Sequence, residues 1–180
     1  MTDRVLVFIA EGFEEIEAVT LVDVLRRAEI PTELVGVEGS LVTGAHGIAV
    51  SATLLLSKLV LGPTDAIVLP GGMPGSAHLR DNLRVRDLLQ SAFEAGSLVG
   101  AICAAPIALE AAGILKGKRA TGYPGFSLPS AIYSDAAVVI DGNIITSRAP
   151  GTALQFALAL VERIRGREIS SRLAADMLTS

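Results

Sequence analysis

The sequence predicts an α/β domain in which helices cover both faces of a doubly wound, mostly parallel β-sheet. Short apolar runs alternate along the chain with longer segments of helical periodicity, which is the pattern of repeated βαβ units. Hydrophobic residues make up 51% of the 180 residues, but aromatic residues only 4%. The core is therefore aliphatic, as in strands buried on both faces of a parallel sheet. No linker or repeat interrupts the pattern, so we expect one domain over residues 1–180.

Apolar runs mark the strands that we expect in this sheet. Each is short, nearly uncharged and followed by a turn or a helical segment. The runs cover residues 4–9, 32–37, 65–69 and 98–102. A further short strand is expected over residues 118–121. Two hairpins are expected as well. Residues 41–43 and 48–51 flank a loop that contains His46, at the edge of the sheet, and residues 137–140 and 143–147 flank Asp141-Gly142, a strong hairpin signal.

Helical periodicity predicts the segments that cover the sheet. The first helix spans residues 14–29, and its sheet-facing row is expected to be Ile16, Val19, Val22 and Leu25. Further helices are expected over residues 82–95 and 168–178. Another begins at Ala104, with Pro106 in its first turn, and another runs from an N-cap at Thr152 to residue 164. The short stretch 54–61 is interpreted as a helical turn, and the region up to Tyr133 as a loop.

Composition excludes several classes of function. The net charge of −4, with scattered lysines and arginines, offers no basic field for strong nucleic-acid binding. No apolar run approaches the length of a membrane span, and Met1–Arg4 leads into a strand without the long apolar region of a signal peptide. A single cysteine forms no internal disulfide, which favours a reducing, cytoplasmic setting. One cysteine and two distant histidines give no metal-ligand spacing, so no metal or cofactor site is expected.

That cysteine, Cys103, stands where a buried strand ends and a helix begins. A free cysteine is often an inert, buried small hydrophobe. At the start of a helix, however, free N–H groups and the positive end of the helix dipole favour the thiolate. A sharp strand-to-helix turn also exposes such a side chain above the sheet. Position alone leaves both interpretations open.

Two other strand ends carry groups that complement this thiol. Glu14, Glu15 and Glu17 follow the first strand, and Gly71-Gly72 follow the strand at 65–69. The carboxyl ends of parallel strands lie along one edge of the sheet, where ligands bind. A carboxylate, a nest of glycine N–H groups and a thiol form a set suited to covalent catalysis. We expect Glu17 to be functional, whereas Glu15 needs no role beyond complementing the helix dipole.

Four motifs in order resemble the ThiJ/PfpI family, and most closely its branch of YajL and the parkinsonism-associated protein deglycase. The motifs are Ala10-Glu11-Gly12-Phe13-Glu14-Glu15-Ile16-Glu17, Leu69-Pro70-Gly71-Gly72, Ala101-Ile102-Cys103-Ala104-Ala105-Pro106 and Thr146-Ser147-Arg148-Ala149-Pro150-Gly151-Thr152. The resemblance covers nearly the whole chain. It implies a flavodoxin-like fold, a homodimer, and a glyoxalase or deglycase that acts on methylglyoxal or glycated amino groups without a cofactor.

The resemblance also implies roles for individual residues. Cys103 is the nucleophile, Glu17 contacts its sulfur, and Glu14 lies in the same site. Gly71, Gly72 and Ala104 form the oxyanion and substrate-binding site, which the N–H groups of Gly72 and Ala104 line. An oxidation-sensing chaperone that uses the same cysteine is the alternative function.

Two residues differ from the family pattern, and they bear on how the thiol is activated and on whether the protein is a peptidase. Tyr123 stands where one branch has a histidine, so thiol activation is expected to depend on Glu17 and the helix terminus. Ala104 stands where the protease branch has a histidine, which argues against peptidase activity.

Overall fold

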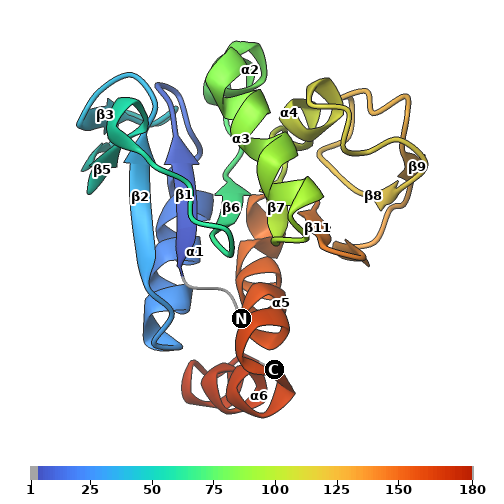
Figure 1. The fold of residues 1–180 in the computed structure, drawn as a ribbon. Helices are drawn as coiled ribbons and strands as arrows, with labels where there is room; N and C mark the ends of the chain where they lie inside the picture. Colours follow the sequence, from blue (N-terminus) through green and yellow to red (C-terminus); the bar gives the residue numbers. More distant parts are fainter. Residues whose placement is uncertain (1–3, 180) are drawn as a thin grey trace.

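The computed structural model describes residues 4–179, and a seven-stranded sheet forms its central layer (Figure 1). From one edge to the other the strands are β10 (Val138–Asp141), β11 (Ile144–Ser147), β7 (Val99–Ile102), β6 (Ala66–Leu69), β1 (Val5–Ile9), β2 (Thr32–Gly36) and β5 (Leu54–Leu55). All neighbours pair in parallel except β10 and β11. The order β2-β1-β6-β7-β11 is the flavodoxin-like order. The predicted fold class is therefore confirmed.

Helices cover the two faces of this sheet (Figure 1). One face carries α1 (Glu15–Arg27) and α5 (Ala153–Arg165), and the other carries α2 (Gly75–Asp81), α3 (Leu83–Glu94) and α4 (Pro106–Ala111). The final helix, α6 (Arg167–Asp176), packs on α5, where Ser170 donates to the Leu158 carbonyl. Among residues 4–179, no helix is long and apolar enough to cross a membrane.

The side chains of strand β1 pack against the helices on both faces of the sheet. All five of its residues are fully buried, and their side chains alternate between the faces. Val5, Val7 and Ile9 join the apolar cluster under α1 and α5, while Leu6 and Phe8 join the cluster under α2, α3 and α4. A continuous apolar run without polar alternation is what such a doubly covered strand requires.

Two small sheets lie outside the central one. The strands β3 (Leu41–Thr43) and β4 (Ala49–Ser51) form the predicted antiparallel hairpin as a separate sheet. The strand β8 (Arg119–Ala120) lies within the predicted strand 118–121 and pairs in parallel with β9 (Ile132–Tyr133), which lies in the region predicted to be a loop. Residues 54–61, expected as a helical turn, form β5 and then the 3₁₀ turn η1 (Leu56–Lys58). The helix α2 has no counterpart among the predicted elements.

The predicted sheet-facing row of α1 is wrong in part. Ile16 and Val19 are 58% and 53% exposed, whereas Ala18, Leu21 and Leu25 are buried. Positions spaced by three residues drift around a helix by about 60° at each step, since one turn takes 3.6 residues. Four such positions span about half the circumference and do not all face the sheet. The buried stripe alternates spacings of three and four residues instead.

Thr152 occupies the predicted N-cap position of α5, but its side chain does not cap the helix. Residues Pro150–Thr152 form the 3₁₀ turn η2 before α5, and no side-chain cap bond is made to α5. The Thr152 hydroxyl accepts from the Ala149 N–H and donates to the Ala149 carbonyl, at 3.1 and 2.8 Å. It also lies 2.7 Å from the Ser147 hydroxyl. These local partners use the hydroxyl that a cap would need.

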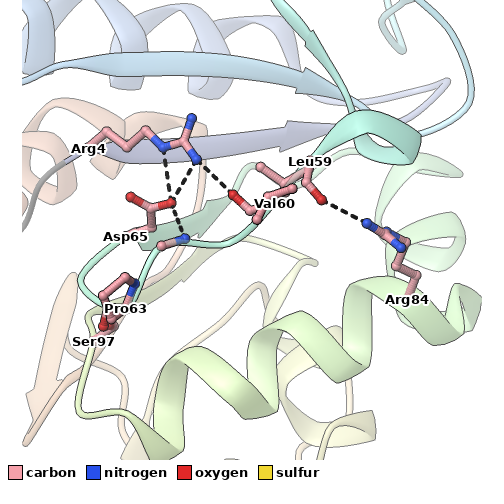
Figure 2. Close-up of polar contacts among 8 residues, drawn as sticks. Arg4, Leu59, Val60, Pro63, Asp65, Arg84 and Ser97 are labelled. Atoms are coloured by element: carbon pink, nitrogen blue, oxygen red, sulfur yellow. Dashed lines mark hydrogen bonds and ion pairs between the residues drawn. The ribbon is translucent and has the colours of Figure 1, made fainter.

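Polar contacts hold the segment that leads from η1 to β6 (Figure 2). The Asp65 carboxylate, which is buried, accepts from Arg4 Nε at 3.0 Å and from the Gly62 N–H at 2.8 Å. Arg4 also donates to the Val60 carbonyl. Two more side chains donate to carbonyls of this segment: Arg84 to Leu59 and Ser97 to Pro63.

Replacing Asp65 with asparagine is expected to lower the free energy of unfolding by about 1–3 kcal/mol, because the change removes the charge that pairs with Arg4 at a buried position and leaves partly buried donors poorly paired. Urea unfolding measures the effect. The matched control is Asp23→Asn, whose ion pair with Arg27 is about half exposed on both sides. That control is expected to cost no more than about 0.5 kcal/mol. Equal losses in the two variants would contradict the role given to Asp65.

Candidate active site

Three loops meet at the carboxyl ends of β1, β6 and β7. The Glu14 N–H donates to the Gly71 carbonyl at 2.9 Å, and the Gly71 N–H donates to Glu17 Oε2 at 2.6 Å. A side chain on Gly71 would meet Cys103 Cβ at 2.7 Å and Glu17 Oε2 at 2.8 Å. The structure therefore brings together the acidic, glycine and cysteine motifs that the sequence analysis singled out.

Cys103 occupies an unusual backbone conformation at the end of β7. Its φ is +62°, in the left-handed region that non-glycine residues rarely adopt. The conformation is held by the backbone, since the Cys103 N–H donates to the Ser147 carbonyl at 3.0 Å and the Cys103 carbonyl accepts from the Tyr123 N–H at 2.7 Å. Such strain, on the order of 1–3 kcal/mol, is concentrated at functional sites. The side chain is directed into the site, and the residue is 8% exposed.

Glu17 reaches the same point from α1 and is fully buried. Burial and, to a smaller extent, the charge of Glu14 raise the pKa of its carboxyl to about 7, against the opposing effect of hydrogen bonds from Gly71 and Cys103. Oε1 has no hydrogen-bond partner of ordinary geometry among the described residues, although the thiol lies close enough to influence the carboxyl. A carboxyl that titrates near neutral pH is suited to general acid–base work.

The thiol itself is not the low-pKa group that its position suggests. Burial, together with the charge and hydrogen bond of Glu17, raises the pKa of Cys103 to about 12, although hydrogen bonds from the N–H groups of Ala104 and Gly72 act in the opposite direction. The helix α4 begins only at Pro106 and has six residues, so its dipole does not outweigh these effects. With Glu17 ionised, the proton stays on the sulfur.

The N–H groups of Gly72 and Ala104 nevertheless point to the sulfur side of the site, since both lower the thiol pKa by hydrogen bonding. Gly72 has φ +86°, and a Cβ there would lie 2.3 Å from the Glu14 nitrogen. Glycine is therefore required both by the backbone conformation and by the close approach of the first loop.

Replacing Gly72 with alanine tests this close approach. Gly96→Ala is the matched control, because Gly96 also has a positive φ of +77° but has no atom within 4 Å of the position that a Cβ would take. The control is expected to cost about 1–2 kcal/mol from the left-handed backbone alone. Gly72→Ala is expected to cost about 1–3 kcal/mol more, from the clash with the Glu14 backbone. Urea unfolding of both variants measures the difference, and equal losses would contradict the assignment.

Glu15 points away from the thiol and holds the β3–β4 loop. Its Oε1 accepts from the N–H groups of His46 and Ile48, at 2.8 and 3.3 Å, and its Oε2 lies 3.0 Å from His46 Nδ1. Burial alone would raise the pKa of Glu15, but hydrogen bonds from its own backbone, His46 and Ile48 together lower it. The contact between Glu15 and His46 joins residues 31 positions apart, and no local sequence pattern predicts it.

The Tyr123 N–H donates to the Cys103 carbonyl, so the two residues are neighbours through their backbones. The half-exposed Tyr123 ring packs edge-on against Phe126, with 6.4 Å between the ring centroids. The two histidines pair with glutamates instead, His46 with Glu15 and His78 with Glu38 at 3.1 Å. The nearest ionisable partner of the thiol is accordingly Glu17.

Comparisons with known proteins find relatives that match most of the chain. A family model described as the DJ-1/PfpI family matches residues 3–163. Protein DJ-1 homolog A of Arabidopsis thaliana is 43% identical over 181 residues, covering 98% of this chain and 46% of that protein. A protein of Pyrococcus abyssi named as a deglycase is 33% identical over 152 residues, covering 82% of this chain and 91% of that protein. The crystal structure of Drosophila melanogaster DJ-1beta matches with a TM-score of 0.94 at 37% identity, covering 100% of both chains.

The chain thus spans less than half the length of the Arabidopsis relative and nearly all of the fly protein. These likenesses confirm the family resemblance that the four short motifs predict.

Proposed function

Because the chain belongs to the DJ-1/PfpI family, we propose that it is a cysteine-dependent glyoxalase or deglycase. Its substrates are methylglyoxal or glycated amino groups, and its products are lactate-type acids. The observation that carries the proposal is the placement of one thiol, Cys103, between the Glu17 carboxyl and the N–H groups of Gly72 and Ala104. The relative named as a deglycase supports the same class of reaction.

The first step is attack of Cys103 on the aldehyde carbon of methylglyoxal. The S–C bond forms as the thiol proton passes to Glu17, whose pKa of about 7 keeps it partly ionised at neutral pH. The thiol pKa of about 12 makes this transfer necessary, since little thiolate is present beforehand. The aldehyde oxygen develops negative charge within reach of the Gly72 and Ala104 N–H groups. Glu17 then passes its proton to that oxygen, so the product is a neutral hemithioacetal and the carboxylate is restored.

The second step moves a proton within the bound substrate. Glu17 or Glu14 takes the proton from the former aldehyde carbon, and an enediol forms. Return of a proton to the neighbouring carbon gives a lactoyl thioester, so one carbon is oxidised while its neighbour is reduced. Water then cleaves the thioester, releases lactate and restores the thiol. No external oxidant or cofactor is needed, and positioned proton transfer contributes on the order of 10²–10⁴-fold.

The alternative is an oxidation-sensing chaperone that uses the same cysteine with little catalysis. Oxidation by peroxide proceeds through an accessible thiolate. The thiol here is buried and its pKa is raised. These properties favour attack on a bound substrate, with Glu17 as base, over fast reaction with peroxide in solution.

One experiment separates the two functions. Purified, reduced protein is incubated with methylglyoxal in buffer without glutathione, and lactate is measured over time. A parallel sample receives mild peroxide, and mass spectrometry follows oxygen addition at Cys103. Catalytic lactate formation is the expected result. Selective oxidation of Cys103 without turnover would instead support the sensor.

A homodimer and a cytoplasmic location complete the proposal. Exposed apolar side chains on α1 and on the β3–β4 hairpin offer a surface for a second copy of the chain: Ile16, Val19, Leu41 and Ile48. A single cysteine suits a reducing compartment.

A further inference from the structure

The end of β11, which lies beside β7 in the sheet, holds both polar groups of the Cys103 backbone (Figure 1). The Ser147 carbonyl accepts from the Cys103 N–H at 3.0 Å. The Cys103 carbonyl accepts from the Tyr123 N–H at 2.7 Å. The segment that contains Tyr123 is itself held by β11, because Thr146 Oγ1 accepts from the Thr121 N–H at 2.9 Å. One bond to the nucleophile's backbone therefore comes from Ser147, and the other comes through Thr146.

The Ser147 hydroxyl ties the end of β11 to two neighbouring segments. It donates to the carbonyl of Ala137, just before β10, at 2.8 Å, and it lies 2.7 Å from the Thr152 hydroxyl in η2. Thr146 and Ser147 are both fully buried, so solvent does not compete for these bonds. The carbonyl that receives the Cys103 N–H is thus fixed by side-chain bonds to two segments outside β11.

Cys103 needs such support because of its backbone conformation. Its φ of +62° lies in the left-handed region, and a strained conformation persists only where the surroundings over-determine it. Residues 146–152 form one of the four motifs that the sequence analysis singled out, yet the proposed reaction uses none of their side chains. Their contacts with the cysteine turn give this motif a role.

We propose that Thr146 and Ser147 are positioning residues for the nucleophile, and that they act through the Cys103 backbone without touching the substrate. This inference rests on the proposed function, because it concerns the same thiol. The two hydroxyls set where the backbone bonds to Cys103 lie, and those bonds place the sulfur against the Glu17 carboxyl and the oxyanion N–H groups. A misplacement of about 1 Å at a reacting atom costs on the order of 10²-fold in rate.

Two variants test the positioning role by steady-state kinetics with methylglyoxal. Thr146→Val and Ser147→Ala each remove one hydroxyl and leave every residue of the proposed reaction in place. Each is expected to lower kcat about 10- to 100-fold and to change KM by less than about threefold, because the sulfur is misplaced while the substrate contacts remain. Thr146→Ser keeps the accepting oxygen for the Thr121 N–H and is expected to restore kcat to within about threefold of wild type.

Ser170→Ala is the matched control for the loss of a buried hydroxyl. Ser170 is also buried, and its hydroxyl donates to the Leu158 carbonyl in α5 at 2.9 Å, a bond that involves no residue of the cysteine turn. The control is expected to lower the urea midpoint about as much as Ser147→Ala and to leave kcat within about twofold of wild type.

Labelling of the Cys103 thiol with iodoacetamide near neutral pH gives a readout that needs no turnover. Thr146→Val and Ser147→Ala are expected to label at least about threefold more slowly than wild type, because a displaced sulfur passes its proton less readily to Glu17. Ser170→Ala is expected to label as wild type does. Circular dichroism shows whether each variant is folded.

Wild-type kcat and wild-type labelling rates in folded Thr146→Val and Ser147→Ala would overturn the positioning role and leave the proposed function standing. An equal fall of kcat in Ser170→Ala would also overturn it, because the loss would then follow stability. Absence of methylglyoxal turnover in the wild-type protein would contradict the proposed function alone. The labelling comparison would still decide the positioning role, since slower labelling supports it and unchanged labelling refutes it.

Discussion

Cys103→Ser is expected to lower methylglyoxal turnover by on the order of 10³-fold or more, while leaving the fold intact. The hydroxyl that replaces the thiol is a far weaker acid and nucleophile, and Glu17, with a pKa of about 7, is too weak a base to activate it. Lactate formation by the two proteins at equal concentration measures the effect.

The stability of the Cys103→Ser variant is the control for this result. The left-handed turn is held by backbone bonds from the Cys103 N–H to Ser147 and from the Tyr123 N–H to the Cys103 carbonyl. Serine keeps both, so the free energy of unfolding is expected to change by less than about 1 kcal/mol. Undiminished turnover in a folded variant would remove Cys103 as the nucleophile.

Glu17→Gln is expected to reduce turnover by on the order of 10²–10⁴-fold, which is the contribution of a positioned proton acceptor. Glutamine retains the acceptor oxygen for the Gly71 N–H but accepts no proton. The loss is expected mainly in kcat, because the proton moves in the reaction rather than in binding. A variant with wild-type kcat would contradict the role of Glu17 as base.

The same substitution is expected to change how stability depends on pH. The pKa of Glu17 is about 7 in the folded protein, against an ordinary value of 4.5. Between these values the folded state binds more protons than the unfolded state, so stability falls as pH rises from about 4.5 to about 7 and then stays level. The fall due to Glu17 is about 3 kcal/mol, from the size of the shift.

Urea unfolding at pH 4.5 and pH 8 tests this linkage. Glu17→Gln lacks the titrating group and is expected to show a smaller loss between the two pH values than wild type. Glu162→Gln, at an exposed position of α5, is the matched control and is expected to follow wild type. Parallel pH profiles for wild type and Glu17→Gln would show that burial does not raise the Glu17 pKa.

Much of the fold is predictable because its signals are local. The run Val5–Ile9 is apolar throughout and marks a strand covered on both faces. Asp141-Gly142 sets the turn between β10 and β11. Cys103 and Gly71 directly follow strands, and Glu17 lies in the first turn of the helix after β1, so the topology of a parallel sheet is enough to bring all three to one edge.

The features that escape prediction depend on surroundings that local sequence does not encode. The exposure of Ile16 and Val19 follows from how α1 is rotated on the sheet. The thiol pKa depends on the depth of burial and on a carboxylate from another element. The Glu15–His46 contact crosses 31 residues, and only the folded hairpin creates it.

The proposed reaction requires that Cys103 form a covalent bond to the substrate, and an acid-quenched time course with methylglyoxal can detect that bond. Intact-protein and peptide mass spectrometry follow an adduct with the mass of one methylglyoxal. This adduct is expected on the peptide containing Cys103, as fast as or faster than lactate, and is expected to accumulate less in Glu17→Gln. Lactate production at the full rate while Cys103 stays unmodified, in a protein shown to retain adducts through the quench, would contradict it.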